Sequence, residues 1–158
     1  ETITVRGMPV TFLVSDYLDG ELLSDFLKRQ PKGRLHPFQA LHLLHALARG
    51  FEEIHRCREY HGDLHPENII VQRCGLHFDL KLIDLYNWDC FPKKENIQDD
   101  VVDMIRVFYY ATGGKRHYEK QPKVVKDICC GLKRSLILKK FNTAAKLTSY
   151  LENMEWEA

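Results

Sequence analysis

Three oxygen-bearing side chains in two neighbouring stretches have the types and spacing that could do chemistry. Asp63 and Asn68 lie in His61-Gly62-Asp63-Leu64-His65-Pro66-Glu67-Asn68, and Asp84 follows the run Leu80–Ile83. Carboxylate and amide oxygens are ligands that Mg²⁺ prefers, and a further carboxylate can orient a hydroxyl beside the metal. The pattern therefore indicates transfer of a phosphoryl group to a hydroxyl.

The elements around these residues must bring them together. Ile69–Val71 and Leu80–Ile83 are short apolar runs typical of strands, and Gly75 lies between them, which predicts an antiparallel hairpin. In a hairpin centred near Leu76, Asn68 and Asp84 fall at the same open end, where directly opposed residues lie within roughly 5 Å. We therefore expect a shared cation site at that end.

The loop before this hairpin carries Asp63. Pro66 forbids regular helix and favours a turn into the strand, which places Asp63 on a loop leading to the same end. The alternative is that Asp63 and Asn68 are ordinary turn residues and Asp84 a strand cap. An ordinary hairpin does not require the whole pattern, so we expect Asp63, Asn68 and Asp84 to converge on one pocket rim.

These stretches resemble two motifs of the protein-kinase-like superfamily. The eight residues from His61 are similar to the catalytic loop H-R-D-x-x-x-x-N, and Asp84 with the two residues after it is similar to D-F-G. The resemblance implies that Asp63 is the catalytic base and that Asn68 and Asp84 are Mg²⁺ ligands. It also implies that His61 braces the backbone rather than reacting.

Four positions depart from these motifs. Gly62 replaces the Arg that reads activation-loop phosphate in many kinases, so that control is expected to be absent. His65 stands where protein-substrate kinases carry a Lys that touches the γ-phosphate, and aminoglycoside phosphotransferases and RIO-type kinases vary there too. Leu85 and Tyr86 replace the Phe and Gly of D-F-G. We assign His65 a catalytic position beside Asp63.

The first twenty residues resemble the end of a kinase N-lobe. Alternation over Thr2–Arg6 and Val10–Val14 predicts a hairpin, and Glu21–Gln30 has apolar residues at helical spacing. The resemblance implies that Ser15 is the gatekeeper and that the backbone of Asp16 and Leu18 binds adenine. Any hairpin followed by a helix has a similar pattern, so this assignment depends on the rest of the match.

The remaining chain is predicted to be mainly helical. Phe38 to about Tyr60 has one apolar stripe, formed by Phe38, Leu41, Leu44, Ala48, Phe51 and Ile54. An irregular segment over 87–98 precedes a helix that Asp99 or Asp100 caps and that Gly113 and Gly114 end.

The helix after Asp99 resembles the central kinase helix. The resemblance implies that Asp100 accepts hydrogen bonds from the backbone around His61 and Gly62, with Asp99 as the competing alignment. Further helices are predicted over Lys123–Lys133 and from Asn142 or Thr143 onward.

The expected fold is therefore α+β: a mostly helical, protein-kinase-like C-lobe with short β-hairpins, and with the N-lobe largely missing. Residues 1–20 would be the last N-lobe strands and the hinge, and residues 21–158 the C-lobe. The sequence contains no Gly-rich loop with a strand Lys to hold ATP phosphates. This chain alone is expected to be inactive or very slow, with an N-lobe supplied upstream or by a partner.

Composition limits the class of partner. The net charge of +1 gives no reason to expect nucleic acid or a membrane, and no apolar run approaches the roughly 20 residues of a membrane span. No signal peptide is visible at the start. Five cysteines without C-x-x-C spacing indicate neither a disulfide framework nor a zinc site. The expected location is the cytoplasm.

Three functions remain open on the sequence. The first is an ATP- and Mg²⁺-dependent Ser/Thr protein kinase with a short activation segment, which the helices after Gly114 favour. The second is a small-molecule alcohol kinase resembling aminoglycoside phosphotransferases, which Gly62, His65 and the short segment after Asp84 favour. The third is a pseudokinase that retains the fold as a binding module.

Overall fold

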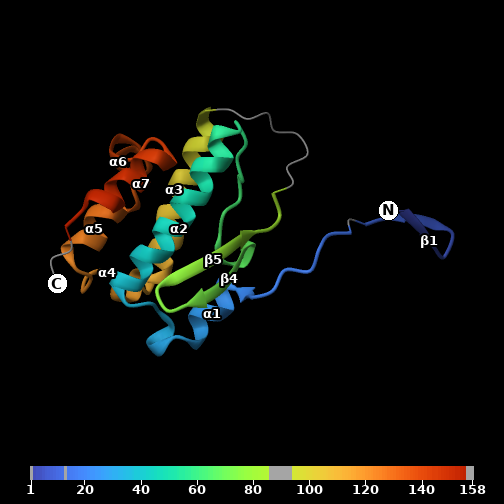
Figure 1. The fold of residues 1–158 in the computed structure, drawn as a ribbon, viewed down its shortest axis with the longest axis horizontal. Coiled ribbons are helices and arrows are strands. Elements are labelled where there is room, and N and C mark those ends of the chain that lie inside the picture. Colours follow the sequence, from blue (N-terminus) through green and yellow to red (C-terminus); the bar gives the residue numbers. More distant parts are fainter. Residues whose placement is uncertain (1, 13, 86–93, 156–158) are drawn as a thin grey trace.

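The computed structural model describes residues 2–12, 14–85 and 94–155, and it has the expected α+β fold dominated by helices (Figure 1). The longer helices pack side by side, and a small sheet lies along one side of them. The α-helices are α1 (Leu23–Arg29), α2 (Pro37–Arg56), α3 (Lys94–Ala111), α4 (Gly114–Tyr118), α5 (Lys123–Cys129), α6 (Arg134–Lys140) and α7 (Ala144–Asn153). The short 3₁₀ turns are η1 (Pro31–Gly33), η2 (Pro66–Asn68) and η3 (Cys130–Leu132). The strands are β1 (Thr2–Val5), β2 (Met8–Thr11), β3 (Glu21–Leu22), β4 (Ile69–Cys74) and β5 (His77–Leu82).

Helix α2 is the centre of the core, because it packs against α3, α7 and β5. Its start is fixed by Pro37 in the first turn and by His36, whose Nδ1 accepts from the Phe38 amide at 3.3 Å. The predicted stripe is buried from Leu41 to Phe51, but Phe38 is 38% exposed. The helix also ends at Arg56, four residues earlier than predicted, because Arg58 adopts the left-handed conformation (φ 61°).

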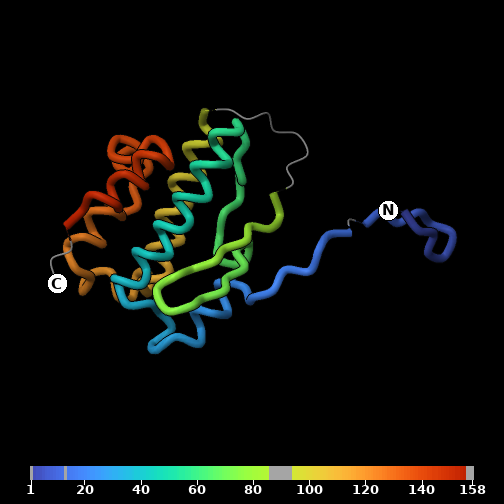
Figure 2. The backbone as a smooth tube through the Cα atoms, in the orientation of Figure 1, coloured from blue at the N-terminus to red at the C-terminus, as the bar shows by residue number. Residues whose placement is uncertain are grey.

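The strands β3, β4 and β5 form one antiparallel sheet, in that order. Ile69 lies opposite Leu82 and Cys74 opposite His77, so the strands are longer than predicted and only Gly75 and Leu76 connect them. Figure 2 shows the chain passing from β3 through α1 to α2 and returning later as β4 and β5. The hairpin therefore lies beside α2 with its open end at Asn68.

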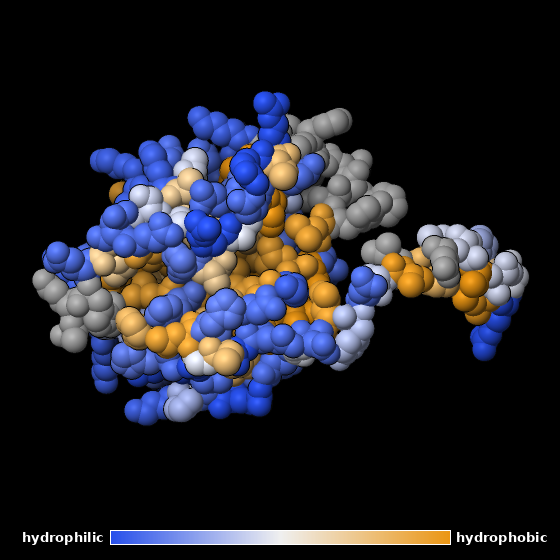
Figure 3. All heavy atoms as spheres, viewed as in Figure 1, coloured by the Kyte–Doolittle hydropathy of each residue, from blue (hydrophilic) through white to orange (hydrophobic). Residues whose placement is uncertain are grey.

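The strands β1 and β2 form a separate two-stranded hairpin with Thr2 opposite Thr11. One face of this hairpin is apolar and exposed. Its side chains are 43–66% exposed: Ile3, Val5, Met8 and Val10. Figure 3 shows these hydrophobic atoms uncovered at the N-terminal end. The second strand was predicted too late in the chain: β2 runs from Met8 to Thr11 rather than from Val10 to Val14, and Val14 is exposed outside any strand.

Helix α3 begins at Lys94, so the irregular segment predicted over 87–98 was wrong for residues 94–98. Asp99 and Asp100 lie inside this helix rather than at its cap. It ends at Ala111 before Gly113 (φ 104°), as predicted. Residues 86–93, including Tyr86 and the rest of the predicted irregular segment, lie outside the described residues.

The C-terminal part contains more helices than predicted. The helix expected over Lys123–Lys133 is α5 followed by η3, because Cys130 turns into the left-handed region (φ 49°). Helices α4 and α6 were not predicted. Thr143 caps α7, and its hydroxyl accepts from the Lys146 amide at 3.2 Å, as one of the two predicted caps. No helix among the described residues combines the length and the hydrophobicity that crossing a membrane requires.

Gly20 tests how β3 joins the sheet. It has φ 127°, and a Cβ there would lie 2.8 Å from Ile70 Cγ2 and 2.9 Å from the Val71 carbonyl oxygen. We expect Gly20→Ala to lower the free energy of unfolding by about 1–3 kcal/mol in urea denaturation. The control Gly50→Ala lies in α2 with open space around it, so it should be neutral or stabilising by up to about 1 kcal/mol. Equal losses in both variants would contradict the close approach of Gly20 to β4.

Candidate active site

The loop that carries Asp63 is held by a buried carboxylate on α3. Asp100 is fully buried, and its two oxygens accept from the backbone amides of His61 at 2.9 Å and Gly62 at 2.8 Å. A charged acceptor bonded to two amides fixes the direction of that backbone. These are the contacts expected for Asp100; its role in support of catalysis stays a prediction.

A single imidazole ring joins the loop to the hairpin. His61 is buried, its Nδ1 accepts from the Asp63 amide at 3.2 Å, and its Nε2 lies 2.9 Å from the Ile83 carbonyl oxygen. Nδ1 acts as the acceptor, so the proton is on Nε2, which donates to Ile83. The ring therefore ties Asp63 to the residue directly before Asp84.

The side chain of Asn68 lies between the same two segments. The side chain is buried and its Nδ2 donates to the Asp63 carbonyl at 2.9 Å, while the backbone carbonyl of Asn68 accepts from the Ile83 amide at 3.0 Å. Asn68 is thus opposite Ile83, and Asp84 lies one residue beyond the directly opposed position. Among the described residues, no donor to Asn68 Oδ1 is found, so this oxygen can serve as a cation ligand.

Asp84 leaves the strand in an unusual conformation. Its φ is 60°, in the left-handed region that few non-glycine residues adopt, and its side chain is in solvent. Strained backbone of this kind persists where the surrounding structure fixes it, and it gathers at functional sites. Here the Ile83 bonds to His61 and Asn68 provide that restraint.

Asp63 and His65 face each other at the surface. Asp63 Oδ2 lies 3.6 Å from His65 Nε2, and the Asp63 side chain is 77% exposed. His65 Nδ1 accepts from the Glu67 amide at 3.3 Å, which leaves the proton on Nε2. The pair therefore offers solvent an exposed carboxylate beside an N–H donor.

The predicted adenine contacts lie on the segment between β2 and β3. Ser15 and Asp16 are exposed and Leu18 is half-buried, on an extended segment without strand partners. No hydrogen bond among the described residues links them to the loop. The structure thus brings Asp63, His65, Asn68 and Asp84 to one end of the hairpin, with His61 and Asp100 supporting the loop. The adenine contacts of Ser15, Asp16 and Leu18 stay a prediction.

His55 is a supporting residue that the sequence analysis did not identify. Its Nε2 lies 3.0 Å from Asp100 Oδ2, its side chain is only 9% exposed, and Nδ1 is buried without a hydrogen-bond partner among the described residues. The ring also meets Phe51 edge-on, with 5.5 Å between centroids. Its position eight residues before Asp63 was the available signal. The predicted helix from Phe38 to about Tyr60 carries three histidines, however, and the sequence does not show which of His42, His45 and His55 is buried.

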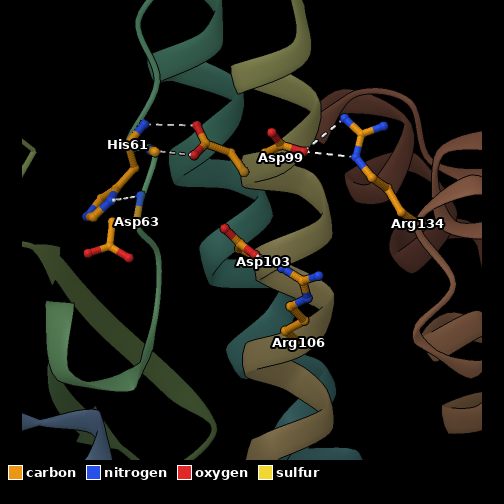
Figure 4. A network of polar contacts seen from close by, with 8 residues as sticks. His61, Asp63, Asp99, Asp103, Arg106 and Arg134 are labelled. Atoms are coloured by element: carbon orange, nitrogen blue, oxygen red, sulfur yellow. Dashed lines mark hydrogen bonds and ion pairs between the residues drawn. The ribbon is translucent and has the colours of Figure 1, made fainter. Parts of the chain in front are cut away.

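Asp100, and not the neighbouring Asp99, is the residue that contacts the loop. Asp99 points to the other side of α3, where it pairs with Arg134 of α6 at 2.9 Å (Figure 4). One turn after Asp100, Asp103 pairs with Arg106 at 2.7 Å. Burial raises the pKa of Asp103, and Arg106 opposes that shift. Neither Asp99 nor Asp103 contacts the loop.

The hydrogen bonds of Asp100 allow a direct test of how the loop is held. We expect Asp100→Asn to lower the free energy of unfolding by about 3 kcal/mol, because an amide cannot accept from both backbone N–H groups and His55. Amide hydrogens of His61 and Gly62 should also exchange faster. The control Asp99→Asn breaks only the half-exposed pair with Arg134 and should cost less than about 1 kcal/mol. Similar losses for the two variants would contradict this account.

Curated proteins similar to this chain are bacterial Ser/Thr protein kinases. The chain is 34% identical over 70 residues to PknA of Corynebacterium glutamicum, 35% over 84 residues to drp72 of Corynebacterium efficiens, and 36% over 72 residues to pkn2 of Myxococcus xanthus. These matches cover 44%, 53% and 46% of this chain, but only 14%, 15% and 8% of the relatives. They support a kinase-type phosphotransferase.

A family model covers more of the chain than these relatives do. The model described as the lipopolysaccharide kinase (Kdo/WaaP) family matches residues 11–120, which include the loop, the hairpin and all of α3. That range is more than half of the 158 residues. This chain therefore belongs to the lipopolysaccharide kinase (Kdo/WaaP) family, within the protein-kinase-like superfamily.

Proposed function

We propose that this chain is the catalytic lobe of an ATP- and Mg²⁺-dependent phosphotransferase whose acceptor is a hydroxyl group of a saccharide. The observation that carries the proposal is the hydrogen-bond network around His61. It ties the backbones of Asp63, Asn68 and Ile83 together, and so sets Asp84 beside the other two functional positions. Catalysis of phosphoryl transfer depends mainly on such positioning and on charge stabilisation.

Each side chain receives a role from its chemistry. The exposed carboxylate of Asp63 orients the acceptor hydroxyl and accepts its proton. Asn68 Oδ1 and the Asp84 carboxylate would hold Mg²⁺, which keeps few protein ligands and neutralises phosphate charge when bound. The His65 Nε2–H, which faces Asp63 at 3.6 Å, can donate to a phosphate oxygen.

The short chain between Asp84 and α3 supports a saccharide rather than a peptide as the acceptor. Only nine residues separate Asp84 from Lys94, where α3 begins. Kinases that act on peptides usually place a long activation segment with A-P-E in this interval, and the interval here is too short for one. The match to a family described by its action on lipopolysaccharide supports a sugar hydroxyl as the acceptor.

A Ser or Thr hydroxyl of a protein is the second candidate. The curated relatives favour it, because all three are named Ser/Thr protein kinases and share 34–36% identity with this chain over 70–84 residues. A pseudokinase or binding module is the third. The two enzyme candidates share the Mg²⁺ site that we propose at Asn68 and Asp84.

The N-terminal hairpin supports the assignment of residues 1–20 to the end of an N-lobe. Two strands alone are at best marginally stable in water, and the apolar face of β1 and β2 is exposed. We propose that an N-lobe sheet carrying the Gly-rich loop and strand Lys packs there, upstream or from a partner. Ser15, Asp16 and Leu18 would then line the nucleotide pocket, and this chain alone would be inactive or very slow. We propose a cytoplasmic location, where ATP is available. The four described cysteines are free, which agrees with a reducing compartment.

Substitution of Asp63 tests whether the protein is an enzyme. In the intact protein, we expect Asp63→Asn to lower kcat for phosphoryl transfer by about 10²–10⁴-fold, because it removes the general base while the loop hydrogen bonds remain. The matched control Asp79→Asn alters an exposed carboxylate paired with Lys81 at the far end of β5, and should change kcat less than about twofold. Full activity of Asp63→Asn would support the binding-module reading instead.

The acceptor is tested separately. With labelled ATP and Mg²⁺, the intact protein should label lipopolysaccharide or its core sugars and leave generic Ser/Thr protein substrates unlabelled. The Asp63→Asn variant serves as the blank for each acceptor. Labelling of protein alone would reverse the order of the first two candidates.

A further inference from the structure

The C-terminal helices carry a strong local charge that the whole-chain value conceals. Residues 114–146 contain ten Lys and Arg but only two Asp and Glu, a net charge of +8, whereas the whole chain has +1. The rest of the chain is therefore at −7. A separation of this size creates a one-signed field over α4, α5 and α6 that an anionic partner would sense.

Four of these lysines surround one exposed leucine, and we call this group the basic surface: Lys126, Lys133, Lys139 and Lys140 around Leu136. All but Lys133 line a hollow of about 570 Å³, with Asp127 as its acidic member. Lys133 lies directly before α6, three residues from Leu136.

The positive charge of the basic surface is not cancelled by carboxylates. Lys126 Nζ donates to the Glu119 carbonyl at 2.7 Å, and Lys140 Nζ donates to the Asp127 carbonyl at 2.9 Å. These acceptors are neutral backbone groups. Within residues 94–155, no ion pair involves any of the four lysines.

We propose that the basic surface docks on a lipid bilayer that contains anionic phospholipids. Clustered lysines are attracted to acidic headgroups, and each contributes to binding near the membrane. Leu136 is 46% exposed and is the one large hydrophobic side chain in the exposed class between residues 114 and 146, all of which are described. It can enter the headgroup region while the lysines contact phosphates.

The same surface is poorly suited to nucleic acid. Single strands are held largely by stacking of bases on exposed aromatic rings. The aromatic residues here are occupied: Tyr118 packs against Tyr109 at 5.3 Å, Phe141 is buried, and Lys140 lies 4.4 Å from the Tyr150 ring centroid. Arg134, which could bind phosphate bidentately, is paired with Asp99.

The start of α6 and the loop are both held by neighbouring residues of α3. Asp100 holds the loop on one side of α3, and the adjacent Asp99 holds the start of α6 on the other through Arg134 (Figure 4). The proposed docking rests on the charge and exposure of the basic surface and not on the proposed function.

Vesicle co-sedimentation of the full chain tests the proposal. We expect binding to phosphatidylcholine vesicles with 30% phosphatidylglycerol, loss of binding as salt is raised, and no binding to phosphatidylcholine alone. Lys133→Glu/Lys139→Glu should weaken binding by at least about tenfold. Neither side-chain amine makes a hydrogen bond among the described residues, so the variant should fold, and its thermal unfolding checks this.

A matched control separates the basic surface from net charge. Lys28→Glu/Arg49→Glu changes the net charge by the same amount on α1 and α2, and should keep binding within about twofold. Leu136→Ser should weaken binding severalfold at salt concentrations that suppress the charge term. Equal loss in both double variants would overturn the proposal. Binding of the chain to single-stranded DNA is measured in parallel. If Lys133→Glu/Lys139→Glu lost DNA binding but kept vesicle binding, the proposal would also be overturned. Neither readout involves phosphoryl transfer, so failure here leaves the proposed function untouched.

Discussion

The buried carboxylate of Asp100 is the interaction on which the candidate active site depends. A charge removed from water must be compensated, and here two backbone amides of the loop and the Nε2 of His55 do so. Because all three partners are needed, the loop, α2 and α3 can take one relative arrangement only. The position of Asp63 therefore follows from packing between helices rather than from the loop sequence alone.

His61 extends this order from the loop to the sheet. One ring accepts from the Asp63 amide and donates to the Ile83 carbonyl, which links the backbone of Asp63 to the residue directly before Asp84. Asn68 closes the network from the other strand. Rigid support beneath exposed functional groups is what a transfer reaction needs, since the groups must be in place before the substrate arrives.

The sequence predicted those parts of the site that are local, and missed those decided by packing. The loop and hairpin are consecutive in the chain, so their spacing alone placed Asp63, Asn68 and Asp84 at one end. Asp99 and Asp100 are the same residue type one position apart, and only the 100° rotation per residue of a packed helix separates their roles. The first turns of α3 contain a single apolar residue, Ile97, and include Asn96, Asp99 and Asp100, which have low helix propensity, so the residues before Asp99 resembled a loop.

The proposed cation site can be tested by paramagnetic broadening, with Mn²⁺ in place of Mg²⁺ and a non-hydrolysable ATP analogue. In amide NMR spectra of the labelled protein, the account predicts that signals of Asp63, Asn68 and Asp84 broaden first, and that Asp84→Asn abolishes the effect. Broadening that is uniform, or that centres on residues away from the open end of the β4–β5 hairpin, would contradict a cation site at Asn68 and Asp84 with Asp63 beside it.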